Sequence, residues 1–585
     1  MKNFFKIFLA SFLALFIFSV ISFFIAIVFL VVLSTPQKPI INPNGVLVLD
    51  LSDGFKEQSQ SNPLASITGN GVSYQPGLYD VVRMLRYAKN DPNIKGLYIE
   101  AGENANGFAA SEELRQAILD FKQNKKFVVA YGETISEKAY FVATTADKVY
   151  CNPTGGLEFN GFSSQLYFLK GLLDKLEIDP QIFYAGKFKS ATEPLRVTQM
   201  TDANRLQTTV WLGDLYSNFL STVSAARNID TATLHNLANT GAVQTAADAL
   251  NNNLVDGLKY DDEVKGEILE SSGKKGTGEI NFISFAKYAK AVNYKQDGTE
   301  KIALIYAQGD IVSGDGKDDQ IGSSDFIRYI RKARLDNNVK AIVLRVNSPG
   351  GSALASDVIW REISLAKQDK PVVVSMGDVA ASGGYFISCN ADEVYADATT
   401  ITGSIGVFSI IPNLQSFFKD KLGVTFDGVK TATYADIGNA GRPLTAQEKM
   451  FMQADVDSIY HTFKSRVAEG RKKDIDYIDS IAQGRVWTGI RAIDVGLVDK
   501  TGSLSDAVRE AAKLAKVTSY YVKEYPETKS LLEQIRDNGI NKSVKENSIE
   551  EQIGKQQYTL LMRLKNVQEM FGTPQAKLPF DFEIQ

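Results

Sequence analysis

The chain has 585 residues, which is too long for one hydrophobic core, so two or more domains are expected. Hydrophobic residues make up 44% and charged residues 23%, the usual balance of a folded protein. The formal net charge of −4 is small for this length and gives no reason to expect nucleic acid as a partner.

The N-terminal segment predicts a membrane anchor. Residues 7–33 are apolar except for three serines, and this run exceeds the roughly 20 residues that a helix needs to cross a bilayer. A cleavable signal has a shorter apolar run, about 7–15 residues, followed by small residues, whereas this run ends in LSTP (33–36). Lys2 and Lys6 precede the run, which favours a cytoplasmic N-terminus. We therefore expect residues 1–44 to hold an uncleaved single-pass anchor, with the body on the outer side of the membrane.

The rest of the chain contains one unit twice. Segment 80–100 aligns with segment 325–345, and segment 125–150 aligns with segment 370–395 at the same offset and without a gap. In each copy, apolar β-rich runs alternate with helical stretches, which is typical of α/β units with buried, partly parallel strands. The sequence therefore predicts a duplicated α/β domain.

The alignment also sets the expected domain limits. We predict a first repeat at 45–298, a second repeat at 299–520 and a C-terminal tail at 521–585. The tail is charged, with one amphipathic stretch at 557–570, and the sequence assigns it no chemistry.

Histidine and cysteine are both scarce. A Ser-His-Asp triad needs a histidine that contacts both partners, but neither His235 nor His461 lies beside a nucleophile motif. A serine nucleophile in this chain is therefore expected to use another base. Two cysteines, Cys151 and Cys389, are too few for a disulfide framework or a four-thiolate zinc site. A single bridge between them stays open, and we expect no metal and no cofactor.

Two glycine-rich turns in the second copy follow buried-strand patterns: NSPGGS (347–352) and AASGGY (380–385). A strand, a tight turn and a helix would expose Ser382 at a helix N-terminus, where unpaired N–H groups favour negative charge. The N–H groups of Gly351 and Gly383 could then form an oxyanion hole. Packing or phosphate binding is the alternative role, but neither turn carries the pattern of a Walker-type phosphate loop.

The first copy lacks these residues. Glu137, Lys138 and Asn106 stand at the first-copy positions of the serine and of the two glycines. The strands persist while the candidate chemical residues change, which favours a chemical role over a structural one.

The candidate base is Lys189, in the segment KFKSATEP (187–194) of the first copy. A lysine acts as a base when burial lowers its pKa, and this segment places Lys189 among aromatic and small residues. The corresponding stretch of the second copy has no lysine at that position. Lys187 and Lys430 are alternatives that spacing does not exclude. With the serine in one copy and the base in the other, a working site must form where the copies meet, with the lysine amine within about 3 Å of the serine hydroxyl.

These motifs resemble those of the signal peptide peptidase A family in its long, duplicated, membrane-bound form. The resemblance covers nearly the whole chain after the anchor. It rests on NSPGG (347–351), ASGGY (381–385), TGSIGV (402–407), KFKSATEP (187–194), GRVWTG (484–489) and GLVD (496–499).

The resemblance implies a fold like that of Clp protease and crotonase, a homotetrameric bowl on the outer face of the inner membrane, and cleavage of signal-peptide remnants and other short apolar peptides. It implies Ser382 as the nucleophile and Lys189 as the general base. It further implies that Gly351 and Gly383 supply the oxyanion N–H groups and that Ser404 orients the lysine amine.

Two functions of other classes stay open. A crotonase-like acyl-CoA enzyme would use the same two N–H groups without needing Ser382, and a catalytically silent membrane scaffold would need neither. An active-site serine probe separates the three, because only the protease should be labelled at Ser382.

Overall fold

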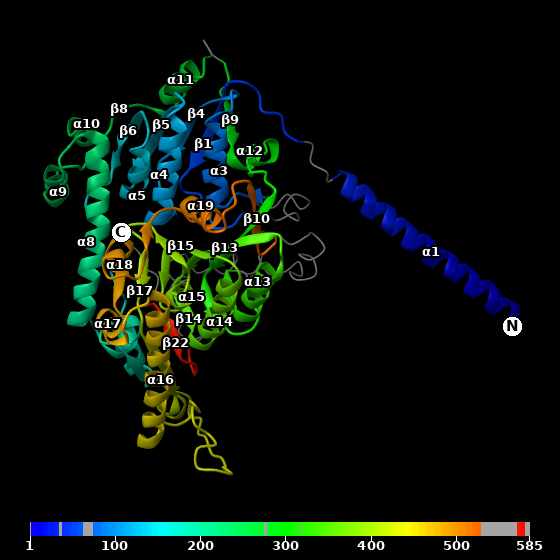
Figure 1. Cartoon of the computed structure of the whole chain (residues 1–585), viewed down its shortest axis with the longest axis vertical. Helices are drawn as coiled ribbons and strands as arrows, with labels where there is room; N and C mark the ends of the chain where they lie inside the picture. Colours follow the sequence, from blue (N-terminus) through cyan, green and yellow to red (C-terminus); the bar gives the residue numbers. More distant parts are fainter. Residues whose placement is uncertain are drawn as a thin grey trace.

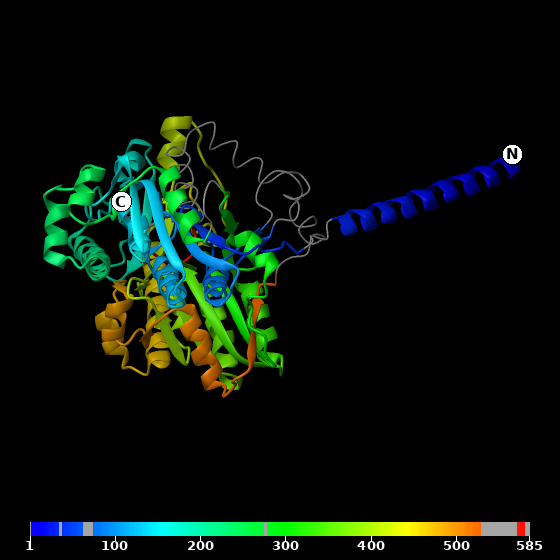
Figure 2. The same ribbon diagram turned by 90° about the horizontal axis from the view of Figure 1, so that it is seen from above.

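The computed structural model describes residues 2–33, 38–61, 74–273, 278–317, 319–527 and 570–578. A single long helix, α1 (Lys2–Leu33), extends away from an α/β body (Figure 1). Figure 2, a view turned by 90°, shows the same separation of the helix from the body. Within α1, Phe4–Ser22 is long and apolar enough to cross a membrane, and none of this stretch is buried against the body. The helix predicted at 7–33 lies inside α1.

The first copy is built on a parallel sheet of order β8-β6-β5-β4-β1-β9. Its strands are β1 (Gly45–Asp50), β4 (Ile94–Glu100), β5 (Phe127–Ile135), β6 (Lys148–Leu157), β8 (Gly257–Leu258) and β9 (Asn281–Ser284). Its helices are α3 (Leu78–Ala88), α4 (Phe108–Lys122), α5 (Glu137–Ala143), α8 (Asp202–Arg227), α9 (Thr231–Asn239), α10 (Ala246–Asn251), α11 (Asp261–Ser271) and α12 (Phe285–Ala291). Parallel neighbours need crossover connections, and these helices supply most of them while covering the sheet.

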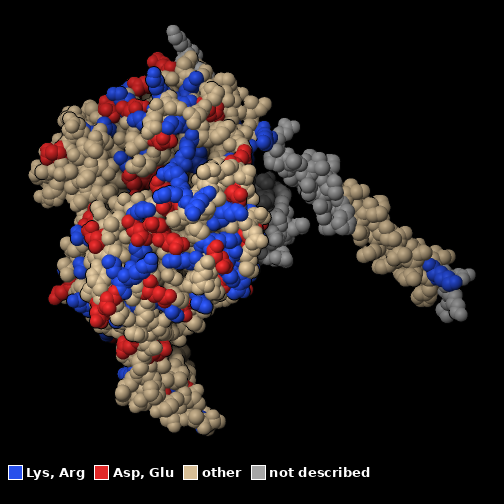
Figure 3. Space-filling model, viewed as in Figure 1, with Lys and Arg blue, Asp and Glu red and all other residues tan. Residues whose placement is uncertain are grey.

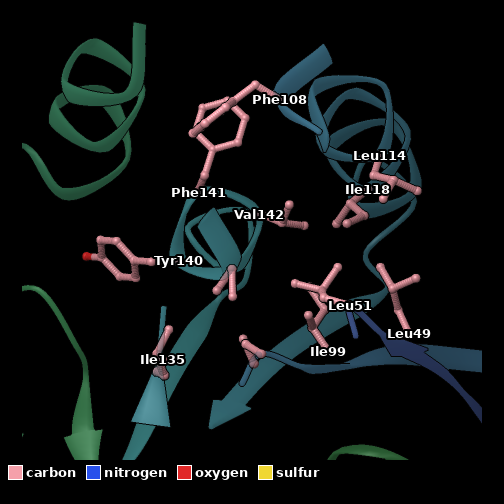
Figure 4. Packing of buried hydrophobic residues seen from close by; sticks show 14 of the residues in the cluster. Leu49, Leu51, Ile99, Phe108, Leu114, Ile118, Ile135, Tyr140, Phe141 and Val142 are labelled. Carbon is pink, nitrogen blue, oxygen red and sulfur yellow. The ribbon is translucent and has the colours of Figure 1, made fainter. Parts of the chain in front are cut away.

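Apolar side chains from strands and helices meet in the core of this copy. Figure 4 shows Ile118 of α4 and Val142 of α5 above Ile99 of β4, all three fully buried. Close packing of this kind fixes where the strand ends lie, and the β5–α5 turn with them.

The second copy repeats this plan with the sheet order β19-β17-β15-β13-β10-β21, in which β16 pairs with β15 and β20. Its strands are β10 (Glu300–Gln308), β13 (Val339–Ser348), β15 (Val372–Ala381), β16 (Glu393–Ala396), β17 (Ile401–Gly403), β19 (Val486–Thr488), β20 (Lys500–Thr501) and β21 (Tyr520–Tyr525). Its helices are α13 (Ser323–Leu335), α14 (Ala353–Asp369), α15 (Gly383–Ser388), α16 (Ala446–Arg471), α17 (Ile475–Ile481), α18 (Gly489–Asp494) and α19 (Leu504–Leu514). The predicted fold class, a duplicated α/β domain, is confirmed.

A third sheet joins the two copies, in the order β12-β11-β14-β22-β18-β7. It contains β7 (Asp179–Ala185) of the first copy together with β11 (Asp310–Val312), β12 (Gln320–Gly322), β14 (Gly350–Ser352) and β18 (Val407–Asn413) of the second. Its remaining strand, β22 (Gln575–Lys577), comes from the predicted tail. This sheet carries the candidate site.

Short elements complete the described chain: β2 (Gln60–Ser61), β3 (Tyr74–Gln75), α6 (Lys170–Lys175), η1 (Ser190–Thr192), α7 (Glu193–Arg196) and η2 (Phe417–Lys421). The predicted limit at 298/299 falls just before β10, and the one at 520 falls on the first residue of β21; these limits stay predictions. Apart from Met570, the amphipathic stretch at 557–570 lies outside the described residues.

A buried ion-pair cluster also ties the copies together. Arg345 of β13 is fully buried, and its guanidinium lies 2.7 Å from Glu57 and 2.8 Å from Glu113 of the first copy. Removing one partner of such a buried pair leaves an uncompensated charge, which costs about 3–5 kcal/mol. On the outside, lysine, arginine and acidic residues are interspersed over the face that Figure 3 shows.

Candidate active site

Ser382 occupies the turn between β15 and α15 with backbone angles φ 56° and ψ −114°. A residue with a Cβ rarely takes this conformation, so the turn holds strain of about 1–3 kcal/mol. Its own N–H donates to the carbonyl of Gly403, and its carbonyl accepts from Phe386, each over 2.8 Å. Although Ser382 is the N-cap of α15, its side chain makes no capping bond. The hydroxyl is therefore free to meet another partner.

That partner is Lys189. Its Nζ lies 2.8 Å from Ser382 Oγ, 3.1 Å from Ser404 Oγ and 3.1 Å from the Ser404 carbonyl oxygen. The structure thus brings together, within one chain, three residues that the sequence put in different segments and different copies.

The third sheet delivers the lysine. Strand β7 leaves the first copy and pairs antiparallel with β18 of the second, from Val407 opposite Ala185 to Asn413 opposite Asp179. The chain turns just after Ala185 and reaches Lys189, while Ser404 lies just before β18. Pairing of these two strands therefore sets the distance between the lysine and the serines.

Two glycines make room for the lysine stem. A Cβ at Gly484 would lie 2.7 Å from Lys189 Cβ, and one at Gly406 would lie 3.1 Å from Lys189 Cδ. Such distances leave no space for a side chain at Gly484 in particular, where φ is also +74°. Both residues belong to motifs seen in the sequence, but nothing in those motifs showed that they contact the lysine.

Gln207 of α8 holds the lysine loop against the second copy. Its Nε2 donates to the Phe188 carbonyl over 3.1 Å and to Ser190 Oγ over 3.0 Å, and its Oε1 accepts from Val486 N over 3.2 Å. The side chain is almost completely buried. A lone glutamine in a long helix carries no sequence signal for this role.

Burial determines the electrostatics of the pair. Lys189 is 1% exposed, and this desolvation lowers the pKa of its amine well below 10.5. The oxygens that surround Nζ belong to hydroxyl and carbonyl groups, which carry no charge to hold the ammonium form. The site therefore favours a neutral amine that can accept a proton.

Ser382 differs from the sequence expectation in one respect, because it is fully buried rather than exposed on a surface turn. The lysine amine fills the space beside its hydroxyl, and α15 packs against β22. Gly383 begins α15, and a Cβ at Gly350 would lie 2.6 Å from Gly383 N. The two glycine-rich turns thus lie against each other, as an oxyanion hole built from both would require.

The alternative bases lie elsewhere. Lys187 is exposed and faces the Phe188 ring, and Lys430 is paired with Asp436 at 2.9 Å. Both histidines are exposed. The cysteines are free and buried, so the bridge that the sequence left open does not form.

Comparison with known proteins gives consistent matches. The model of peptidase family S49 matches residues 120–274 and 364–518, once in each copy. Protease 4 of Salmonella typhi is 37% identical over 513 residues, which are 84% of this chain and 82% of that protein. Protease 4 of Haemophilus influenzae is 36% identical over 489 residues, 80% of this chain and 79% of that protein.

A plant relative matches over a shorter stretch. The chloroplastic serine protease SPPA of Arabidopsis thaliana is 33% identical over 440 residues, 74% of this chain and 64% of that protein. Among solved structures, a point mutant of ClpP1 from Listeria monocytogenes is 15% identical and covers 35% of this chain and 94% of its own, with a TM-score of 0.24. That likeness is too weak to bear on the fold.

Proposed function

The chain belongs to peptidase family S49 and is a serine protease of that family, and from this premise we propose that it works through a Ser–Lys pair in which Ser382 is the nucleophile and Lys189 the general base. One observation supports this assignment above the others. The amine of Lys189 lies 2.8 Å from Ser382 Oγ, in a buried site whose other contacts to the amine are neutral oxygens. That geometry fits a base that activates a serine.

In the proposed reaction, Ser382 Oγ attacks the peptide carbonyl carbon while the neutral Lys189 amine takes the hydroxyl proton. The N–H groups of Gly351 and Gly383 donate to the developing oxyanion. Ser404 Oγ accepts a hydrogen bond from the Lys189 amine. This bond orients the amine so that the nitrogen lone pair points at Ser382 Oγ. Lys189 then gives the proton to the leaving amine, and a water molecule hydrolyses the ester formed on Ser382.

A fluorophosphonate probe tests the assignment. We expect labelling at Ser382 in the full chain and none in Ser382→Ala, with loss of peptide hydrolysis in both Ser382→Ala and Lys189→Ala. An acyl-CoA enzyme or a silent scaffold would leave Ser382 unlabelled. Hydrolysis that persists in Ser382→Ala would refute the nucleophile.

The proposed substrates are signal-peptide remnants and other short apolar peptides. Strand β22 lies between β14 and β18 in the third sheet. Strand addition of this kind binds the backbone of an unfolded segment, which supports this substrate class. Synthetic apolar peptides should be cleaved much faster than a folded protein of equal concentration. Equal rates on both would argue against a preference for short peptides.

We further propose that α1 anchors the protease in the inner membrane, with Lys2 and Lys6 on the cytoplasmic side and the body outside. Protease added to spheroplasts should digest the body, and inverted vesicles should protect it. The opposite pattern would reverse the orientation.

The proposed assembly is a homotetramer. Support comes from the projection that precedes α16, where large apolar side chains, including Phe426 and Val429, are exposed. Exposed apolar patches of this kind mark protein–protein interfaces. Light scattering of the detergent-solubilised chain should give four copies per particle. A monomer at all concentrations would refute the assembly.

A further inference from the structure

Strand β22 fills a slot in the third sheet. It pairs antiparallel with β14, with Gly351 opposite Ala576, and it meets β18 at Phe408 opposite Gln575. No other described strand joins β14 to β18. Without β22, both strands would present unpaired backbone groups to the slot, which is the way an extended peptide is bound by strand addition.

The slot runs along the catalytic residues. Its β14 side contains Gly351, and its β18 side begins just after Ser404. The next strand beyond β18 is β7, which leads to Lys189. A peptide lying in this slot is therefore presented to the Ser–Lys pair.

The register places the carbonyl of Ala576 at the oxyanion position. Ala353 N donates to the Pro574 carbonyl over 3.2 Å, and Leu578 N donates to the Pro349 carbonyl over 2.8 Å. Hydrogen-bonded pairs alternate along an antiparallel ladder. Residues 351 and 576 lie midway between these two pairs, so they also occupy a hydrogen-bonding position.

The glycines on both turns accommodate this carbonyl. A Cβ at Gly350 would lie 2.1 Å from the Ala576 oxygen, and a Cβ at Gly383 would lie 3.0 Å from it. Ala576 itself is fully buried. The carbonyl thus lies where the two glycine-rich turns meet, beside the turn that holds Ser382, and only a small side chain fits before the bond that follows.

The residue after that bond has a charged partner. Lys577 Nζ lies 2.6 Å from Asp310 Oδ2, with side-chain exposures of 17% and 33%. Asp310 begins β11, which pairs with β14 where Ile311 lies opposite Gly351. The acid is therefore fixed by the same sheet that positions the oxyanion turn.

We propose that the bond between Ala576 and Lys577 is a substrate of this site in its own chain, and that Asp310 selects a basic residue directly after the cleaved bond. The inference rests on the proposed Ser–Lys mechanism. Ser382 Oγ bonds to the Ala576 carbonyl carbon and its proton passes to Lys189. The C–N bond to Lys577 breaks, the proton passes to the new amine, and water hydrolyses the ester to leave a carboxylate on Ala576.

Mass spectrometry of the purified full chain, incubated at alkaline pH, tests the cleavage. We expect a chain that ends at Ala576 and a peptide that begins at Lys577, and neither product from Ser382→Ala. A short apolar peptide with no basic residue is hydrolysed in parallel. If the peptide is hydrolysed while the tail stays intact, this inference alone is overturned. If neither the peptide nor the tail is cleaved and the probe does not label Ser382, the proposed function is overturned as well.

A charge exchange tests the selection. Lys577→Glu and Asp310→Lys should each slow tail cleavage about tenfold, because each replaces an attraction by a repulsion. The double variant Asp310→Lys with Lys577→Glu should recover most of the rate. The control is Asp319→Lys, an exposed acid just before β12 that pairs with Lys56 instead of Lys577, and it should cleave at the normal rate. Equal rates in Lys577→Glu and the unchanged chain would overturn the role of Asp310, even if Asp310→Lys failed to fold.

Discussion

The turn between β15 and α15 and its counterpart between β5 and α5 use a serine in opposite ways. In the first copy, Ser136 is the N-cap of α5 at φ −73°, and its Oγ accepts from Ala139 N. In the second copy, Ser382 caps α15 at φ 56°, makes no capping bond, and lies 2.8 Å from Lys189 Nζ. In the relaxed turn the serine hydroxyl stabilises the helix as a cap, whereas in the strained turn the hydroxyl stays available for chemistry.

Side chains also fill the first-copy turn where the second copy leaves space. Asn106, at the position of Gly351, accepts from Phe55 N over 2.8 Å and so ties its loop to the segment that follows β1. Glu137, at the position of Ser382, accepts from Gly161 N over 2.9 Å, and burial raises the pKa of its carboxyl to about 7. The comparison indicates that a reactive turn differs from a structural one in two ways. It has the serine, and its glycines leave the backbone N–H groups uncovered by side chains.

Substitution at the two aligned positions should give the largest contrast. Ser382→Ala removes the proposed nucleophile and should lower peptide hydrolysis by about 10⁴-fold or more. Glu137→Ala should leave hydrolysis within about twofold, since its carboxyl accepts from the Gly161 backbone of the first copy. Steady-state peptide assays measure both. Near-normal turnover in Ser382→Ala would break the comparison.

Lys189 should make the rate of peptide hydrolysis depend on pH. Because burial lowers its pKa below 10.5, hydrolysis should rise with pH through a single limb below that value as the amine becomes neutral. Between the lowered pKa and about 10.4, the unfolded chain binds more protons than the folded one, so the free energy of unfolding should also rise with pH. Lys189→Met should lose both the activity and this slope.

The profile has a clear counter-result. Activity that falls as pH rises through this range would contradict a lysine base. A limb near pH 6.5 that survives replacement of both His235 and His461 would do the same.

Adding a side chain at a glycine of the reactive turn should have the next largest effect on hydrolysis. In Gly383→Ala the new Cβ would lie 2.7 Å from Ser356 Oγ and 3.0 Å from the Ala576 oxygen, so the N–H should move away from a bound carbonyl. We expect kcat to fall by about 10²–10³-fold with a smaller change in KM. Lys138→Ala, at the aligned first-copy position, is the matched control and should leave kcat unchanged. A large change in KM with a constant kcat would indicate lost binding instead.

The smallest effects concern stability and should have opposite signs in the two turns. Ser136→Ala removes a helix cap and should lower the free energy of unfolding by about 1 kcal/mol, with normal hydrolysis. Ser382→Gly relieves a strained positive φ and should raise it by about 1 kcal/mol while abolishing hydrolysis. Chemical denaturation measures both. A loss of stability in Ser382→Gly would show that the turn is not strained.

Local sequence carried much of the site because the turns are local structures. A buried-strand run followed by Ser-Gly-Gly and an apolar helix predicts where Ser382 and Gly383 lie without any distant contact. The repeat added the contrast with Glu137, and the apolar N-terminal run predicted the helix α1. Lys189 lies in a motif of the other copy, so the sequence alone leaves its contact with Ser382 a hypothesis, and the tertiary structure is needed to place the two residues side by side.

What the sequence determined by itself was the duplicated α/β domain, the apolar helix and the candidate residues for the chemistry, since hydrophobic periodicity and turn residues act over a few positions. Only the tertiary structure decided that β7 pairs with β18 of the other copy, that Gln207 holds the lysine loop, and that β22 of the tail lies between β14 and β18. Backbone hydrogen bonds make these pairings, and almost any side chain is compatible with a backbone bond, so distant strands leave no pattern that names their partner.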